Sequence, residues 1–112
     1  MSYIPNQGDI IYMDFDPQAG HEQKGRRPAL VISNSTYNKA TRMALVCPIT
    51  NTNRNFPLHI ALNSKTKTSG FLMCEQVKAL DINFRNAEFY ERIPTNLMQE
   101  VFDIIYGIIE IE

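Results

Sequence analysis

Side chains that could act together on a phosphate ester lie close to one another near the start of the chain. Residues 21–28 read His-Glu-Gln-Lys-Gly-Arg-Arg-Pro, and the apolar segment 29–33 follows directly. Polar loops held by a rigid strand often carry chemistry, so His21, Glu22 and Arg27 are candidate catalytic residues. A guanidinium presents a planar fork of donors to a phosphate and stays charged at cellular pH. An imidazole, or a carboxylate with a raised pKa, can act as a general base.

A second apolar segment, residues 43–50, ends in Thr50, and the polar run Asn-Thr-Asn-Arg-Asn follows it. The Thr50 hydroxyl can bond a phosphate oxygen or orient an attacking hydroxyl. Cleavage of RNA by its own 2′-OH needs in-line positioning, proton transfer at both oxygens and charge stabilisation on phosphorus. Arg27, Thr50 and either His21 or Glu22 would supply these parts. The alternatives stay open: Arg27 and Thr50 could simply end strands, and His21 and Glu22 could be solvated loop residues.

Polar and cationic side chains around these two segments suit contacts with single-stranded RNA. Cations bind phosphates in a salt-dependent way, whereas amides and an aromatic ring suit unstacked bases. The residues expected to contact RNA on this ground are Gln23, Lys24, Arg26, Asn51, Asn53, Arg54 and Phe56. For Gln23 the alternative is ordering of its own loop. For residues 51–56 it is a plain connecting loop, which favours the same residue types.

Metal ligands and cofactor motifs are not evident in the sequence. Asp14 and Asp16 share a face of a predicted strand, but two carboxylates without a nearby His make a poor metal site. Cys47 and Cys74 fit no zinc spacing and are expected to be buried free thiols. His59 lies between two apolar residues and is expected on the exposed side of a strand. We therefore expect neither a metal nor a cofactor.

The charge of the chain is unevenly distributed, although the formal net charge is only −1. Residues 24–74 contain eight of the 11 Lys and Arg residues and no Asp or Glu, which favours a polyanionic partner. The alternative is that folding interleaves acidic and basic regions. With 112 residues and 44% apolar residues, the chain has the size and composition of one globular domain. It shows neither a membrane-spanning run nor a signal peptide, so we expect a cytoplasmic protein without membrane contact.

The apolar patterns predict several short strands and two helices. Pro48, inside one predicted strand, indicates a bulge or an edge position. Residues 34–40 are predicted as a short helix capped by Asn34 or Ser35, and the segment from Pro94 to Ile109 as an amphipathic helix. Strands are predicted over residues 8–16, 27–33, 43–50, 58–62 and 70–77, and residues 85–92 are ambiguous. The predicted fold is a single α+β domain over residues 1–112, mostly β, in which a C-terminal helix caps a partly closed antiparallel barrel.

Four segments in this order resemble the MazF/PemK family of toxin–antitoxin ribonucleases: residues 8–16, 20–33, 47–50 and 70–78. The family pattern of Glu-Gln, a short spacer and Arg-Pro before an apolar strand is present as residues 22–23 and 27–28. The resemblance implies that Arg27 and Thr50 are the main catalytic residues.

A further family segment, an acid followed by Gln, is matched by Glu75-Gln76-Val77-Lys78. By resemblance, Gln76 is expected to support the active-site loop and Lys78 to contact the RNA backbone. One branch of the family has an arginine and an aspartate at the positions that align with Met73 and Glu75. Because this chain lacks that arginine and its acid is one methylene longer, it is more similar to the MazF-type pattern.

The resemblance also implies a fold, an activity and partners. The fold would be the barrel with an SH3-like core that MazF and PemK toxins share with the gyrase-binding CcdB toxins. The protein would be a homodimer that cleaves single-stranded RNA at short sequences without a ribosome or a metal, leaving a 2′,3′-cyclic phosphate or 3′-phosphate and a 5′-hydroxyl. A cognate MazE-like antitoxin would block the site with its disordered C-terminal segment, and DNA would be contacted only through that antitoxin. The alternatives are a CcdB-like toxin that binds gyrase without cleaving RNA, and a noncatalytic regulator with an SH3-like barrel.

Overall fold

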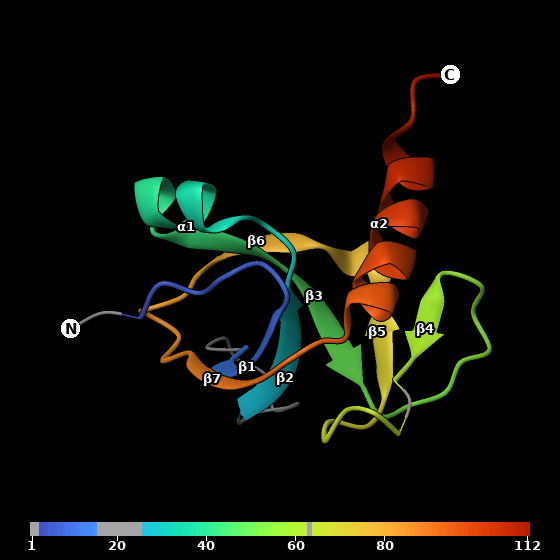
Figure 1. Cartoon of the computed structure of the whole chain (residues 1–112), viewed down its shortest axis with the longest axis horizontal. Coiled ribbons are helices and arrows are strands. Elements are labelled where there is room, and N and C mark those ends of the chain that lie inside the picture. The colour runs from blue at the N-terminus through green and yellow to red at the C-terminus, as the bar shows by residue number, and fades with distance from the viewer. Residues whose placement is uncertain (1–2, 16–25, 63) are drawn as a thin grey trace.

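The computed structural model of the protein describes residues 3–15, 26–62 and 64–112. Figure 1 shows a curled sheet, with the short helix α1 on one side and the long helix α2 on the other. The elements are β1 (Asp9–Asp14), β2 (Arg26–Val31), α1 (Ser35–Thr41), β3 (Met43–Thr50), β4 (His59–Ala61), β5 (Phe71–Met73), the 3-10 helix η1 (Cys74–Gln76), β6 (Lys78–Asp81), β7 (Glu88–Arg92) and α2 (Thr95–Ile109).

The strands form an antiparallel sheet in the order β4-β5-β3-β2-β1-β7, and β6 also pairs with β3. The first half of β3 pairs with β6, from Met43 to Val46, and its last two residues pair with β5. Among the described residues no pairing joins β4 to β7, so the sheet curls without closing. The predicted fold, a mostly β α+β structure with a partly closed antiparallel barrel and a C-terminal helix, is confirmed.

Pro48 lies inside β3 at the point where the strand changes neighbours. On one side it is opposite Ala29 of β2. On the other side the register of β6 ends at Val46 and that of β5 begins at Ile49. A proline is tolerated here because the ladder on that side is interrupted, and the missing backbone N–H costs little. The predicted edge position is therefore confirmed locally, within a strand that is otherwise central.

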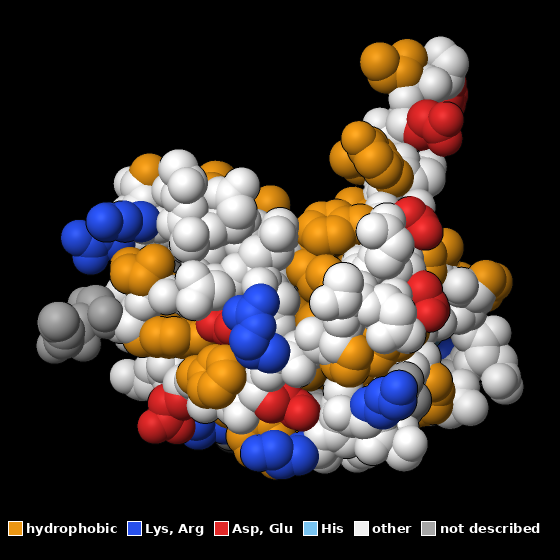
Figure 2. Space-filling model, in the orientation of Figure 1, with side chains coloured by type: hydrophobic (Ala, Val, Ile, Leu, Met, Phe, Trp, Pro, Cys, Tyr) orange, Lys and Arg blue, Asp and Glu red, His pale blue; other side chains and the backbone are white. Residues whose placement is uncertain are grey.

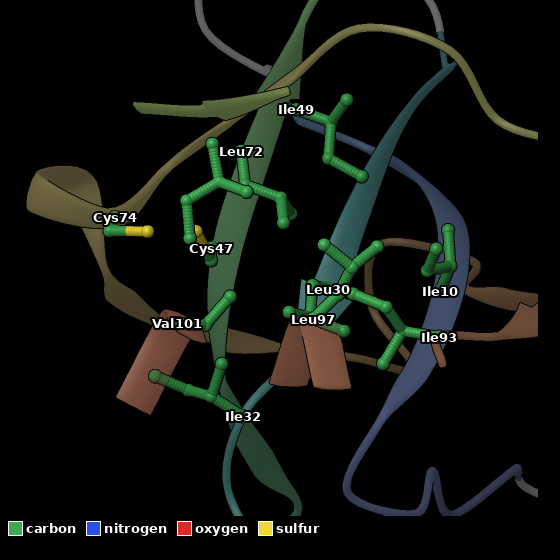
Figure 3. Packing of buried hydrophobic residues seen from close by; sticks show 11 residues of the cluster. Ile10, Leu30, Ile32, Cys47, Ile49, Leu72, Cys74, Ile93, Leu97 and Val101 are labelled. Atoms are coloured by element: carbon green, nitrogen blue, oxygen red, sulfur yellow. The ribbon is translucent and has the colours of Figure 1, made fainter. Parts of the chain in front are cut away.

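Both faces of the sheet carry buried apolar side chains. One face lines the inside of the curl, and α2 covers the other. Neighbouring residues of β1 and β2 alternate between two clusters: Ile10 and Leu30 belong to the first, and Ile11 and Ala29 to the second. α2 packs on the first cluster with Leu97 and Val101, as Figure 3 shows. α2 thus packs against the same cluster as residues of β2 and β3, whose ends carry the candidate catalytic residues.

The sequence patterns located the helices well and one strand poorly. Asn34 caps α1, its side chain accepting a hydrogen bond from the Tyr37 N–H. The ambiguous segment 85–92 contains β7. The prediction of a strand over residues 70–77 is wrong, because β5 ends at Met73 and η1 follows. Both cysteines are buried and unlinked, as expected.

The last turns of α2 extend beyond the body of the molecule (Figure 1). Apolar side chains lie exposed on this part and just after it, as Figure 2 shows, and they include Tyr106, Ile109 and Ile111. Neither α2 nor the other described helix combines the length and the hydropathy that crossing a bilayer requires.

Candidate active site

The pairing of β2 with β3 brings Arg27 and Thr50 to the same place. Ala29 is opposite Pro48 and Val31 is opposite Val46. Continuing this register by two residues puts Arg27 opposite Thr50, and opposed residues of an antiparallel pair share a face of the sheet. Arg27 is half-buried and Thr50 is 6% exposed. The extended register therefore puts these two residues on one face of the sheet, and their joint catalytic role stays a prediction.

A groove formed by two adjoining depressions surrounds the end of β2, and both depressions are lined by Arg27, Pro28 and Ile49. The first has a volume of about 180 Å³ and the second of about 290 Å³. The first is also lined by Phe15, Pro48, Met73, Gln76 and Lys78. The second is also lined by Tyr12, Arg26, Asn51, Lys67, Thr68 and Ser69. We call the two together the Arg27 groove.

Gln76 and Lys78 line the first depression, and a His–Glu pair contacts Gln76. The His59 ring nitrogen Nε2 is 3.0 Å from Glu75 Oε2, and Gln76 Nε2 donates to the same oxygen at 3.3 Å. Burial would raise the pKa of Glu75, but the hydrogen bonds from His59, the backbone and Gln76, together with the charge of His59, lower it. The expectation that His59 is exposed is wrong: its side chain is 4% exposed, because β4 folds onto η1.

Thr50 is held in a tight backbone environment. Its hydroxyl accepts a hydrogen bond from the Thr52 N–H at 3.2 Å. Gly70, with φ of 123°, lies so close that a Cβ there would be 2.6 Å from the Thr50 carbonyl oxygen. Only glycine allows this approach without strain. The loop before β5 is thereby fixed against the end of β3.

Arg26 lines the second depression, but its guanidinium is engaged within the protein. It forms ion pairs with Asp14 at 3.3 Å and Glu88 at 3.2 Å. It also donates to the carbonyl oxygens of Tyr12 and Asn86. These contacts tie β2 to β1 and to the segment before β7. A phosphate contact of Arg26 stays a prediction.

The candidate base-reading segment, residues 51–56, is exposed throughout. Asn51 lines the second depression, whereas Asn53, Arg54 and Phe56 line neither. Asn53 Oδ1 accepts a hydrogen bond from the Asn55 N–H at 2.9 Å, so one amide of the segment shapes the loop itself. The Phe56 ring lies edge-to-face on His59, with 5.1 Å between the ring centroids. The segment is therefore joined to the His59–Glu75 pair. His21, Glu22, Gln23 and Lys24 lie outside the described residues.

Two features of the groove do not follow from the sequence analysis. The patterns indicate Tyr12 only as part of a strand, and they indicate the segment that contains Lys67-Thr68-Ser69 only by its positive charge. The signal for the turn was present: two lysines among Ser and Thr before Gly70, in the segment without acids. Folding does interleave the charges, since Glu91 accepts hydrogen bonds from this turn and Arg26 pairs with two carboxylates. Figure 2 shows acidic and basic side chains beside one another.

Chemically, the groove offers a guanidinium and an ammonium group to a phosphate, with amides beside them. Arg27 and Lys78 contribute the charges to the first depression, Gln76 contributes an amide there, and Asn51 contributes an amide to the second depression. Among the described residues, no three His, Cys, Asp or Glu side chains are arranged to hold a metal ion. The arrangement suits binding of a phosphodiester and stabilisation of negative charge on it.

Comparison with known proteins gives a consistent result. Residues 6–108 match the family of PemK-like, MazF-like toxins of type II toxin–antitoxin systems. The Endoribonuclease toxin MazF of Escherichia coli (strain K12) is 39% identical over 85 residues, 76% of each chain. Endoribonuclease PemK of Escherichia coli is 34% identical over 99 residues, which cover 85% of this chain and 74% of that protein.

Solved structures agree over nearly the whole chain. A MazE-MazF structure (Form-II) from Deinococcus radiodurans superposes with a TM-score of 0.90 and 33% identity, covering 99% of this chain and 100% of that one. MazF (Form-I) from the same organism gives a TM-score of 0.87 and 34% identity, covering 98% and 100%. Sequence, fold and groove thus agree: this chain belongs to the PemK-like, MazF-like toxins of type II toxin–antitoxin systems.

Proposed function

We propose that this protein is an endoribonuclease toxin that cleaves single-stranded RNA at short sequences, independently of the ribosome and of metal ions. The observation that carries the proposal is the Arg27 groove. Extending the β2–β3 register by two residues puts Arg27 opposite Thr50. Gln76, Lys78 and Asn51 line the groove together with Arg27, whereas Thr50 lines neither depression. Relatives that are 39% and 34% identical are named endoribonucleases, which supports the reaction class.

In the proposed reaction the 2′-oxygen attacks the adjacent phosphorus while the bond from phosphorus to the 5′-oxygen breaks. The proton of the 2′-OH goes to a base, for which His21 and Glu22 are the proposed candidates, and a proton is delivered to the departing 5′-oxygen. The products are a 2′,3′-cyclic phosphate, which water can open to a 3′-phosphate, and a 5′-hydroxyl. Arg27 stabilises the charge that builds up on the phosphoryl oxygens, and Thr50 orients the reacting group. In this role the Arg27 guanidinium supplies the positive charge that a metal would provide in other nucleases.

We assign the recognition of the RNA strand to residues around the proposed catalytic residues. Asn51 stands closest to the groove, and Asn53, Arg54 and Phe56 continue away from it along an exposed segment that an unpaired strand can follow. Gln23, Lys24, Arg26 and Lys78 are proposed to contact the RNA beside the cleaved bond. Both depressions are open to the surface, so a single strand can enter without the ribosome presenting it.

We also propose a cytoplasmic homodimer with a cognate antitoxin. Related structures contain MazF together with MazE. An acidic, disordered C-terminal segment of a MazE-like antitoxin would cover the cationic groove and block it. The antitoxin would provide the only link to DNA. The gyrase-binding alternative is not favoured, because it gives the Arg27 groove no role.

The decisive experiment is a cleavage assay on a long RNA in EDTA with wild type, Arg27→Ala, Thr50→Val and Lys39→Ala. Lys39 is an exposed lysine in the last turn of α1 that lines neither depression, and it is the matched control. We expect discrete fragments from wild type and from Lys39→Ala, and none from Arg27→Ala. Thr50→Val should be slower by about a hundredfold if its hydroxyl acts on the transition state.

The outcomes separate the parts of the proposal. Mapping the fragment ends gives the recognition sequence, and random cleavage would refute sequence specificity. Cleavage that requires a divalent ion would refute metal independence. Intact RNA with every variant would refute nuclease activity, and a gyrase inhibition assay would follow.

A further inference from the structure

The turn between β4 and β5 is held in place by a carboxylate from another part of the chain. Glu91 of β7 accepts hydrogen bonds from the Lys67 N–H at 3.0 Å, the Thr68 N–H at 2.8 Å and the Thr68 hydroxyl at 2.7 Å. Thr68 is buried, and its carbonyl oxygen accepts from the Thr66 hydroxyl at 2.7 Å. At its other end the turn is fixed by the contact of Gly70 with Thr50. The exposed Lys67 thus lies on a turn that is fixed at both ends.

Next to this turn lies a pair of tyrosines. The Lys67 ammonium nitrogen is 5.2 Å from the centroid of the Tyr90 ring, and Tyr90 meets Tyr12 edge-to-face at 5.1 Å between centroids. Tyr12 and Lys67 both line the second depression, beside Arg27. Tyr90 is 38% exposed. A cation and an exposed aromatic surface therefore lie side by side at the edge of the groove.

We propose that this second depression is a nucleotide subsite, in which Lys67 binds a backbone phosphate of the RNA and the Tyr12–Tyr90 pair contacts a base. The inference rests on the proposed nuclease function and names the part of the groove that holds the nucleotide adjoining the cleaved bond. Glu91 is a positioning residue, since it acts on the RNA only through the turn it holds.

Two observations favour Lys67 as the phosphate ligand of this depression. Arg26, the other cation that lines it apart from Arg27, has two carboxylate partners. Glu91 and Lys67 attract each other electrostatically, but both oxygens of Glu91 already accept hydrogen bonds from the turn. The Lys67 ammonium group, in contrast, projects to the exposed side over a ring.

A nucleotide fits this surface better than an acidic peptide does. A nucleotide carries both a phosphate and a π-face, which match the lysine and the tyrosines, and stacking of bases on aromatic rings is sequence-tolerant. A glutamate or aspartate side chain would use the lysine alone. The subsite therefore adds affinity for the RNA chain next to the cleaved bond, without selecting its sequence.

The test measures binding of an oligonucleotide that cannot be cleaved. Its sequence is taken from the mapped cleavage site, and a 2′-methoxy group replaces the attacking hydroxyl. Affinity is measured across a range of salt concentrations for wild type, Lys67→Ala, Lys67→Arg, Tyr90→Leu and the control Lys39→Ala. Thermal unfolding of each variant establishes that it is folded.

We expect Lys67→Ala to weaken binding and to reduce the slope of log K against log salt by about 0.7, the value for one phosphate contact on a single strand. Lys67→Arg should restore both, and Lys39→Ala should match wild type. Tyr90→Leu should weaken binding about fivefold or more while leaving the slope unchanged. In cleavage assays Lys67→Ala should raise KM more than it lowers kcat, because the contact is made in ground and transition state alike.

The inference is overturned if wild type binds and cleaves while Lys67→Ala retains the wild-type affinity and slope. It is also overturned if Lys67→Ala loses affinity for a ten-residue oligoglutamate peptide but not for the oligonucleotide, which would assign the surface to an acidic peptide. A wild-type protein that neither binds the oligonucleotide nor cleaves the parent RNA would refute the proposed function itself.

Discussion

At the scale of single residues, the site depends on side chains whose charges have defined partners. Arg26 is committed to Asp14 and Glu88, and Glu91 to the turn that carries Lys67. The position of a residue in the sequence does not reveal which charged or polar partner its side chain contacts. Arg26 and Arg27 are neighbours, are equally cationic and both line the second depression, but they pair with different residues of β1, Arg26 with Asp14 and Arg27 with Met13. A sequence pattern could therefore name both arginines, but only the pairing of strands could separate their surroundings.

The pH dependence of stability provides a residue-scale prediction for Glu91. Burial alone would raise its pKa, but the hydrogen bonds from Lys67 and Thr68, with the charge of Lys67, lower the pKa below its usual value. A carboxyl group with a lowered pKa stabilises the fold above its unfolded pKa, near 4.3. That stabilisation is lost as pH falls through the lower pKa of the folded state.

We therefore expect Glu91→Gln to unfold more easily than wild type at pH 7, by about 1–3 kcal/mol, because hydrogen bonds to a charged acceptor are weakened. The difference should shrink as the pH is lowered from 5 to 3, where wild-type Glu91 becomes neutral like glutamine. Urea unfolding at several pH values measures it. A difference that is independent of pH would show that Glu91 is not charged in the folded protein.

At the scale of elements, the geometry of the groove is set where β3, β5 and the turn before β5 meet. The apolar segments of β1, β2 and β3 could be predicted from sequence, because their patterns are local. The 3-10 helix over Cys74–Gln76 could not, since apolar Cys74 and Val77 extend the apolar run of β5, and its turn is fixed by packing against α2 and β4. Likewise, the hydrogen bond from the Thr68 N–H to Glu91 joins residues 23 positions apart, which no local sequence pattern reveals.

Two glycines provide matched element-scale substitutions with opposite expected effects. At Gly70 a Cβ would be 2.6 Å from the Thr50 carbonyl oxygen, and φ is 123°. Gly70→Ala should destabilise the fold by about 1–3 kcal/mol and displace the end of β3, lowering cleavage activity. At Gly107, inside α2, a Cβ would meet nothing within 4 Å. Gly107→Ala should stabilise the protein by up to about 1 kcal/mol, with unchanged activity.

Thermal or urea unfolding and a cleavage assay on both glycine variants check this contrast. If Gly70→Ala were as stable and as active as wild type, the close contact between Gly70 and the end of β3 would not determine the geometry of the groove. A loss of stability in Gly107→Ala would instead indicate that this part of α2 is packed against something absent from a single chain.

At the scale of the whole molecule, the far end of α2 is the least expected surface. Its apolar residues continue beyond the sheet they could cover, and they leave a depression of about 460 Å³ between the helix and the body. Tyr106 is 68% exposed and Ile109 is 67% exposed. The helical period of α2 predicts an apolar face, but the length of sheet available beneath it follows only from the tertiary fold.

This surface supports the proposed homodimer, since contiguous apolar patches on soluble proteins often mark interaction sites. We expect the Ile109→Asp variant to be more monomeric than the wild-type protein, because a carboxylate at the centre of an apolar interface would be desolvated without a partner. Phe84→Asp is the matched control: Phe84 is 71% exposed, but lies in the turn between β6 and β7. Sedimentation velocity over a range of protein concentrations measures both variants. If Ile109→Asp remained dimeric while Phe84→Asp dissociated, the interface would lie on the β6–β7 side of the sheet, and the exposed end of α2 would need another partner.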